Sequence, residues 1–145
     1  MKSIAHILQS KTLKTVATVS PSTPVLDAIG EMAEKKIGAL LVTEGAQIVG
    51  IVTERDYARK VELMGRSSRQ TQVREIMSAP VMYVKPDQSN EECMVLMTEN
   101  RLRHLPVIDC GELIGLISIG DLVKDIISEQ KFIIEQLEHY IRGER

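Results

Sequence analysis

The chain has 145 residues and a formal net charge of -2 at pH 7, with 43% hydrophobic and 26% charged residues. This length allows one compact domain or two closely packed half-domains and excludes several large ones. The charge excludes a general attraction to nucleic acid or to anionic membranes, and an aromatic content of 3% without tryptophan argues against base-stacking platforms. No apolar run approaches the roughly 20 residues of a membrane span, and the first residues lack the apolar region of a secretory signal. We therefore expect a cytoplasmic protein that binds neither nucleic acid nor membrane.

An internal duplication covers most of the chain. Residues 48–56 (IVGIVTERD) return 65 positions later as residues 113–121 (LIGLISIGD), and the register holds without a gap from residues 16–61 to residues 81–126. Two copies of a unit that is too short to bury a core alone are expected to fold against each other.

In the first copy, a proline-bounded segment is followed by a helix, two strands and a second helix. The first helix is expected to have Thr23 as its N-cap, Pro24 as its first residue and Gly38 at its end. Thr53 is expected to cap the second helix. The expected strands are residues 16–20, 39–43 and 48–52.

The second copy repeats this order, with Ser89 and Ser118 as the expected helix caps. Its expected strands are residues 81–85, 104–108 and 113–117. The predicted fold class is therefore α/β (α+β): two tandem β-α-β-β-α repeats, packed with pseudo-two-fold symmetry, plus a C-terminal helical extension.

The remaining segments flank and join the two copies. The expected organisation is an N-terminal lead-in (1–15), repeat 1 (16–64), a linker (65–75), repeat 2 (76–128) and a C-terminal helix (129–145). The duplication also pairs residues 7–8 (Ile-Leu) with residues 76–77 (Ile-Met) if the first copy has a four-residue insertion near residues 10–13. On the last helix, apolar residues recur with heptad spacing at Ile127, Ile134 and Ile141. This stripe predicts either a partner or dimer helix or packing against the rest of the chain.

Metal, redox and catalytic motifs are not visible in the sequence. Cys93 and Cys110 do not form a Cys-x-x-Cys pair, and the three histidines are scattered. We interpret Cys93 as a small apolar residue on a helix and Cys110 as a turn thiol, while a thiol sensor would require an exposed thiol with a low pKa. No Walker loop, Gly-x-Ser-x-Gly or His-Glu-x-x-His motif is present, so we expect neither an enzyme nor a required metal.

The pattern glycine, two apolar residues, hydroxyl, two residues, aspartate occurs at 50–56 and at 115–121. Occurring twice in register behind a proline-bounded segment, it resembles the CBS domain, named for cystathionine beta-synthase, as a tandem pair (a Bateman module) over residues 16–128. The resemblance implies a regulatory module that binds an adenosine nucleotide in clefts between the copies, often as a disc-shaped homodimer. Such a stand-alone module would sense energy or cofactor state and act in trans on a partner protein. The implied ligands are AMP in the first place, and ATP, ADP or NAD as alternatives.

The resemblance also assigns roles to the repeated helix starts. Asp56 and Asp121 offer paired acceptors to the vicinal hydroxyls of a ribose, and Thr53 and Ser118 place a hydroxyl near phosphate or ribose. The alternative is that these Thr-x-x-Asp and Ser-x-x-Asp sequences only form capping boxes. The other phosphate or hydroxyl candidates are Arg55, Arg66, Ser67, Ser68, Arg103 and His104. The adenine candidates are Thr18, Val19, Tyr83, Val84 and Pro106.

The phosphate candidates lie in two basic segments. Residues 55–74 carry six cations against two acids, which indicates either a phosphate-binding nest or a solvated linker. Residues 103–107 resemble the Arg-His-x-Pro-Val segment of ligand-binding members, although a lone histidine at a strand start is commonly structural. The first copy has Gly-Ala-Leu-Leu-Val at 38–42 and lacks this pattern, so the two sites are expected to differ. A ligand-free dimeric interaction scaffold remains the alternative function.

Overall fold

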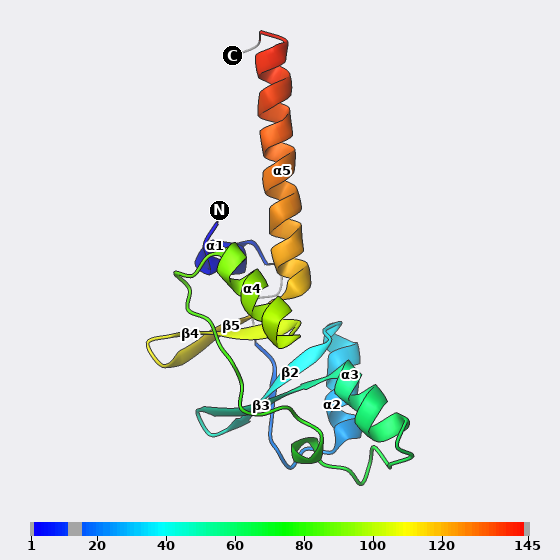
Figure 1. Ribbon diagram of the computed structural model, residues 1–145. Helices are drawn as coiled ribbons and strands as arrows, with labels where there is room; N and C mark the ends of the chain where they lie inside the picture. Colours follow the sequence, from blue (N-terminus) through cyan, green and yellow to red (C-terminus); the bar gives the residue numbers. More distant parts are fainter. Residues whose placement is uncertain (1, 12–15, 144–145) are drawn as a thin grey trace. The chain divides into compact units, whose positions relative to one another are not determined.

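The computed structural model describes residues 2–11 and 16–143. It confirms the expected α/β class, with two small sheets, flanking helices and a long C-terminal helix (Figure 1). The chain divides into two compact units. The first unit is Thr15–Met82, and the second unit consists of the described parts of Met1–Lys14 and Tyr83–Arg145.

The first unit holds a three-stranded sheet. Its elements in chain order are β1 (Thr18–Val19), α2 (Val25–Lys35), β2 (Ala39–Glu44), β3 (Gln47–Thr53), α3 (Glu54–Tyr57), the π-helical turn η1 (Ala58–Glu62) and the 3-10 turn η2 (Val73–Glu75). Strand β1 runs parallel to β2, and β2 pairs antiparallel with β3. The continuous apolar run at 39–42 is fully buried, as expected for the central strand of a covered sheet.

The second unit holds a two-stranded sheet. Its elements are α1 (Ile4–Ser10), α4 (Asn90–Asn100), β4 (His104–Asp109), β5 (Glu112–Ser118) and α5 (Ile119–Ile141). Its hairpin repeats the register of the first, because His104 faces Ser118 as Ala39 faces Thr53. Ser89 caps α4 as expected. Within residues 2–11 and 16–143, none of the helices combines the length and apolar character needed to cross a membrane.

The segment that enters each copy is less regular than expected. In the first copy only two residues form β1, and in the second copy the strand expected over 81–85 is reduced to a single bridge at Val84. The reason lies in the neighbouring strand. Leu41 donates its N–H to the carbonyl of Ala17 at 3.3 Å, whereas the equivalent Pro106 has no N–H to donate. The second entry segment therefore lacks one bond of the parallel ladder.

Both ends of α2 differ from the expectation. Thr23 is not the N-cap: its hydroxyl accepts the N–H of Ser20 at 3.2 Å and closes the preceding turn, so that Pro24 becomes the cap residue. Gly38 does not end the helix either. Lys36 takes the left-handed cap conformation, with φ 56°, and its N–H satisfies the last carbonyls. The expectation failed because a non-glycine residue adopts the strained cap position here.

Two short segments, α1 with Lys11 and residues 73–77, complete the cores of the two units and are called the lead-in segments below. Ile7 of α1 is 2% exposed in the core of the second unit, and Ile76 is 1% exposed in the core of the first. The match of residues 7–8 to residues 76–77 is therefore confirmed as a structural equivalence. Residues 12–13, part of the insertion that this match requires, lie outside the described residues.

The repeated glycines have a steric explanation. A Cβ added to Gly50 would lie 2.5 Å from the sulfur of Met77, and a Cβ added to Gly115 would lie 2.6 Å from a methyl group of Leu8. Each glycine thus leaves room for the side chain of a lead-in segment against a strand. This close approach accounts for glycine at the same place in both copies.

Candidate functional site

The start of α3 is closed by a reciprocal capping box. The N–H of Asp56 donates to the hydroxyl of Thr53 at 3.1 Å, and the N–H of Thr53 donates to Oδ2 of Asp56 at 2.9 Å. The Thr53 hydroxyl also donates to the same oxygen, at 3.1 Å. The other oxygen, Oδ1, lies 3.2 Å from the ammonium of Lys60. Both carboxylate oxygens of Asp56 are therefore engaged.

The start of α5 has the same capping box. The N–H of Ser118 donates to Oδ2 of Asp121 at 2.8 Å, and the N–H of Asp121 donates to the Ser118 hydroxyl at 3.1 Å. Lys11, which follows α1, places its ammonium 2.9 Å from the same Oδ2. Among the described residues, Oδ1 of Asp121 has no hydrogen bond or ion pair. Asp121 therefore has one carboxylate oxygen that no described residue engages, whereas both oxygens of Asp56 are engaged.

Burial and charge act in opposite directions on Asp121. Burial raises the pKa of this carboxyl, but the hydrogen bond from the Ser118 backbone and the charge of Lys11 outweigh it and hold the pKa below the ordinary value of 3.8. Asp121 is consequently a carboxylate at neutral pH, with its charge concentrated beside the helix start.

His104 and Arg103 lie at the same helix start. The N–H of Ile119 donates to the carbonyl of Arg103 at 2.8 Å, and His104 faces Ser118 across the hairpin. Burial lowers the pKa of His104 below 6.5, although the nearby charge of Asp121 raises it, so this imidazole is neutral at pH 7. The expected phosphate candidates of the second copy are thus brought together around one helix start.

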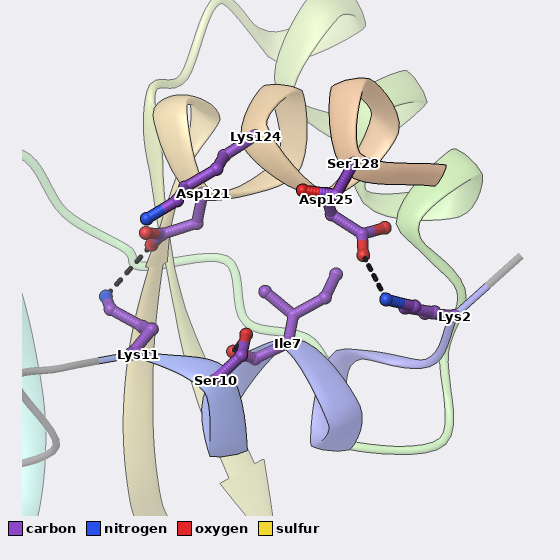
Figure 2. Close-up of a pocket in the computed structure, with 8 residues that line it drawn as sticks. All are labelled: Lys2, Ile7, Ser10, Lys11, Asp121, Lys124, Asp125 and Ser128. Carbon is purple, nitrogen blue, oxygen red and sulfur yellow. Dashed lines mark hydrogen bonds and ion pairs between the residues drawn. The ribbon is translucent and has the colours of Figure 1, made fainter. Parts of the chain in front are cut away.

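A pocket of about 250 Å³ lies beside Asp121, between α1 and the first turns of α5 (Figure 2). Two ion pairs cross it, from Lys11 to Asp121 at 2.9 Å and from Lys2 to Asp125 at 3.7 Å. Mixed charges of this kind suit a polar ligand with both hydroxyl and anionic groups. The lining residues are Lys2, Ile7, Ser10, Lys11, Asp121, Lys124, Asp125 and Ser128.

The basic segment between the copies is built into the first unit by hydrogen bonds. Arg66 donates to Glu75 at 2.6 Å, and the carbonyl of Ser67 accepts the N–H groups of Gln70 and Thr71. The carbonyl of Ser68 accepts the N–H of Leu26 on α2 at 3.0 Å. This segment is therefore an ordered turn with a paired arginine.

The family model of the CBS domain matches residues 10–63 and 73–128. This is a CBS domain protein with two tandem repeats. A structure described as a putative signal-transduction protein with CBS domains, from Burkholderia ambifaria, is 61% identical, with a TM-score of 0.86 over 89% of this chain and 96% of that one. The curated protein CBSX3 of Arabidopsis thaliana, named as mitochondrial, is 40% identical over 124 residues. The match covers 82% of this chain and 60% of CBSX3, so the chain spans less than two thirds of that relative.

A more distant structure of the same fold contains ligands. The CBS domain pair of protein MJ0100, 18% identical with a TM-score of 0.76, was solved in complex with 5'-methylthioadenosine and S-adenosyl-L-methionine. At this identity the likeness to our CBS protein concerns the fold.

The adenine candidates have different exposure in the structure. The side chains of Val84 and Pro106 are buried in the second unit, and Val19 is 8% exposed in the first. Thr18 and Tyr83 are exposed, with Tyr83 at 52%. Only these last two side chains offer substantial surface to a ligand, and the buried three shape the strands behind them.

Sequence reasoning missed the lysines of the site. Lys11 and Lys60 hold the two aspartates, yet neither was among the candidates. For Lys60 the available signal was its spacing of four residues from Asp56 on the same helical segment. For Lys11 it was the match of residues 7–8 to residues 76–77, because that match indicates that the lead-in contacts the repeat. The pocket residues of α5 beyond Asp121 had no counterpart in the repeated motif.

Proposed function

We propose that this CBS protein is a regulatory module that binds an adenosine nucleotide and acts in trans on a partner protein. AMP is the first ligand to test, followed by ATP, ADP and NAD. CBS domain proteins are typically regulatory, and we propose no catalytic role and no metal requirement for this one.

The free oxygen of Asp121 carries this proposal. A carboxylate that is ionised, fixed by a capping box and open at Oδ1 is suited to accept a ribose hydroxyl. Asp56 has both oxygens engaged, so a ribose there would have to displace Lys60. We therefore propose Asp121 as the primary ribose ligand and Asp56 as that of a weaker second site.

Phosphate binding is assigned to the groups around the same helix start. Ser118 and His104 offer polar groups, Arg103 offers an exposed cation, and Lys11 is already within reach of Asp121. For the second site we propose Thr53, Arg55, Arg66, Ser67 and Ser68. Arg66 would have to leave Glu75 in order to bind a phosphate, which again makes this site the weaker one.

Adenine is assigned to the entry segment of each unit separately. In the second unit Tyr83 is the exposed wall, with Val84 and Pro106 behind it, and in the first unit Thr18 is the exposed wall, with Val19 behind it. That the fold accommodates adenosine compounds is supported by the MJ0100 pair, whose structure contains two of them. Polar backbone groups beside an aromatic surface are a common arrangement for binding a base.

Isothermal titration of the nucleotide-stripped protein with each nucleotide tests the proposal. Asp121→Ala should weaken binding at least tenfold, because a hydrogen bond to a charged group contributes about 1.5–3 kcal/mol. Asp56→Ala is the matched control, since it removes the same capping box in the other unit, and it should weaken the tighter site by less than about twofold. Equal loss in both variants, or no saturable binding to the folded protein, would contradict the assignment.

One observation favours a second candidate function, a ligand-free interaction scaffold. Both aspartates already complete capping boxes, which need no ligand. In that case Asp121→Ala would lower the unfolding free energy by about 1 kcal/mol without any effect on nucleotide binding. We further propose a homodimer in the cytoplasm, and cell fractionation would test this compartment against the mitochondrial location named for CBSX3.

A further inference from the structure

Helix α5 continues beyond the CBS repeats with an apolar face that no other described element of its own unit covers. The family match ends at residue 128, whereas the helix ends at Ile141. Figure 1 shows this part of α5 extending away from α1, α4 and the hairpin of its own unit. On this face the exposed fractions of the large apolar side chains are 50% for Ile127 and Ile133, 55% for Ile134 and Leu137, 82% for Tyr140 and 80% for Ile141. Phe132, which is 60% exposed, lies on the other side of the helix. Within this unit, packing against the rest of the chain, one of the two alternatives from the sequence, is therefore wrong for these residues.

The apolar face follows a heptad pattern. With Ile127, Ile134 and Ile141 at position a, position d holds Gln130 and Leu137. Such spacing of a and d residues is the pattern of a helix that pairs with another helix. The adjoining g positions at 126, 133 and 140 are also apolar. They widen the line of a and d residues, which is called the seam below.

The charges beside the seam discriminate between two orientations of a second copy. The e positions hold Lys131 and Glu138. In a parallel pair e faces g of the other helix, so both charges would face isoleucines. In an antiparallel pair e faces e, and when Ile134 lies opposite Leu137 of the partner subunit, Lys131 lies opposite Glu138 of the partner subunit. The two-fold symmetry then creates this ion pair twice.

We propose that α5 pairs antiparallel with α5 of a second copy through the segment that follows residue 128. The inference rests on the homodimer of the proposed function and gives that dimer an interface outside the CBS repeats. It makes Ile134 and Leu137 the central layer and Gln130 with Ile141 the flanking layer. Nucleotide binding is not required for the pairing.

Charge exchange tests the orientation in the full-length protein. Lys131→Glu or Glu138→Lys alone turns both ion pairs into repulsions and should raise the dimer dissociation constant roughly fivefold to tenfold, whereas the double variant should restore it. Glu135→Lys is the matched control, because position b lies away from the seam, and it should leave the dissociation constant unchanged. Sedimentation velocity measures all four. A double variant as weak as the single ones overturns the antiparallel pairing.

Disulfide trapping tests the register directly. In a Cys110→Ser background, with Cys93 left buried in α4, Gln130→Cys and Ile141→Cys chains carrying different tags are mixed and oxidised. Cross-links between the two kinds of chain support the antiparallel register, and cross-links formed within each kind alone overturn it.

A seam variant separates the failure of this inference from failure of the dimer. Ile134→Asp with Leu137→Asp should give a folded monomer, because these side chains are exposed in the single chain. A variant that remains dimeric overturns α5 as the interface and leaves the homodimer standing elsewhere. If the unaltered protein is a monomer at high concentration, both proposals fail. Titration of the monomeric variant with AMP tests nucleotide binding independently.

Discussion

At the starts of α3 and α5 a lysine pairs with the aspartate of the capping box, but the two lysines come from different parts of the chain. In the first unit, Lys60 lies one turn after Asp56 on the same helical segment. Its ammonium bonds the carboxylate at 3.2 Å and the carbonyl of Ile76, in the lead-in segment of that unit, at 2.9 Å. A cation from the helix thus reaches the lead-in.

In the second unit the lysine belongs to the lead-in segment and reaches the helix start. Lys11 follows the lead-in helix α1 and bonds Asp121 at 2.9 Å and the carbonyl of Leu116 in β5 at 2.7 Å. In both units a lysine joins a helix-start carboxylate to a backbone carbonyl and ties the lead-in to the repeat. The comparison teaches that the duplicated copies share an interaction, while the position of the residue that makes it has changed.

The largest loss of unfolding free energy is expected where the lead-in segments contact the strands. Gly50→Ala should lower the unfolding free energy by about 2–3 kcal/mol and Gly115→Ala by about 1–2 kcal/mol. The difference arises because a methyl group at Gly50 would also lie 3.1 Å from the backbone oxygen of Ser78, whereas at Gly115 the three nearest atoms all belong to the flexible side chain of Leu8. Urea unfolding measures both. A Leu8→Ala change should recover part of the loss in Gly115→Ala, and no recovery would rule out this contact as the cause.

Removing each lysine tests whether the two ties are equivalent. Lys11→Met should lower the unfolding free energy by about 1 kcal/mol and Lys60→Met by about 0.5 kcal/mol, because the side chain of Lys60 is 45% exposed and that of Lys11 only 25%. Lys11→Met should also raise the pKa of Asp121, which carboxyl NMR can follow. An unchanged Asp121 titration would remove Lys11 as a cause of the low pKa.

The two copies should also differ in their response to acid, because His104 has alanine at the equivalent position. The folded state holds the pKa of His104 below 6.5, so the unfolded chain binds a proton first and stability falls as the pH drops below 6.5. Asp121 adds a further loss below pH 3.8, since its folded-state pKa is also lowered. His104→Gln should therefore make the unfolding free energy less dependent on pH between 7 and 5, relative to pH 8. Equal slopes in the variant and the unaltered protein would contradict the buried neutral imidazole.

The smallest expected effect is a difference in the chemical reactivity of the two thiols. Cys93 is fully buried, and burial raises its pKa to about 11, while Cys110 is exposed in the turn of the second hairpin. Iodoacetamide should modify Cys110 in the folded protein and Cys93 only after unfolding, as mass spectrometry can show. Modification of Cys93 under native conditions would reopen the redox-sensor hypothesis.

The hairpins and the helix caps at Thr53, Ser89 and Ser118 could be predicted from the sequence because their signals are local: apolar runs, turn residues and capping boxes. Two failures were local, since Thr23 bonds Ser20 in place of capping α2 and Lys36 ends that helix before Gly38. The others depended on partners distant in the sequence. The entry segment of the second copy is short because of Pro106, which lies about 20 residues further on. Lys11 reaches Asp121 across more than 100 positions, and no periodicity signals such a contact.

Each unit also takes part of its core from the segment that precedes the other copy. Ile76 is needed to complete the first core, and Ile4 and Ile7 fill the second together with residues 84–122. During synthesis, α1 leaves the ribosome before both repeats and finds its partners only after residues 84–122 have been made. Contacts of such long sequence separation are formed late and slowly. Ile4 and Ile7 therefore lack the core that they later fill until residues 84–122 have been made, and during this interval a chaperone has time to act on them.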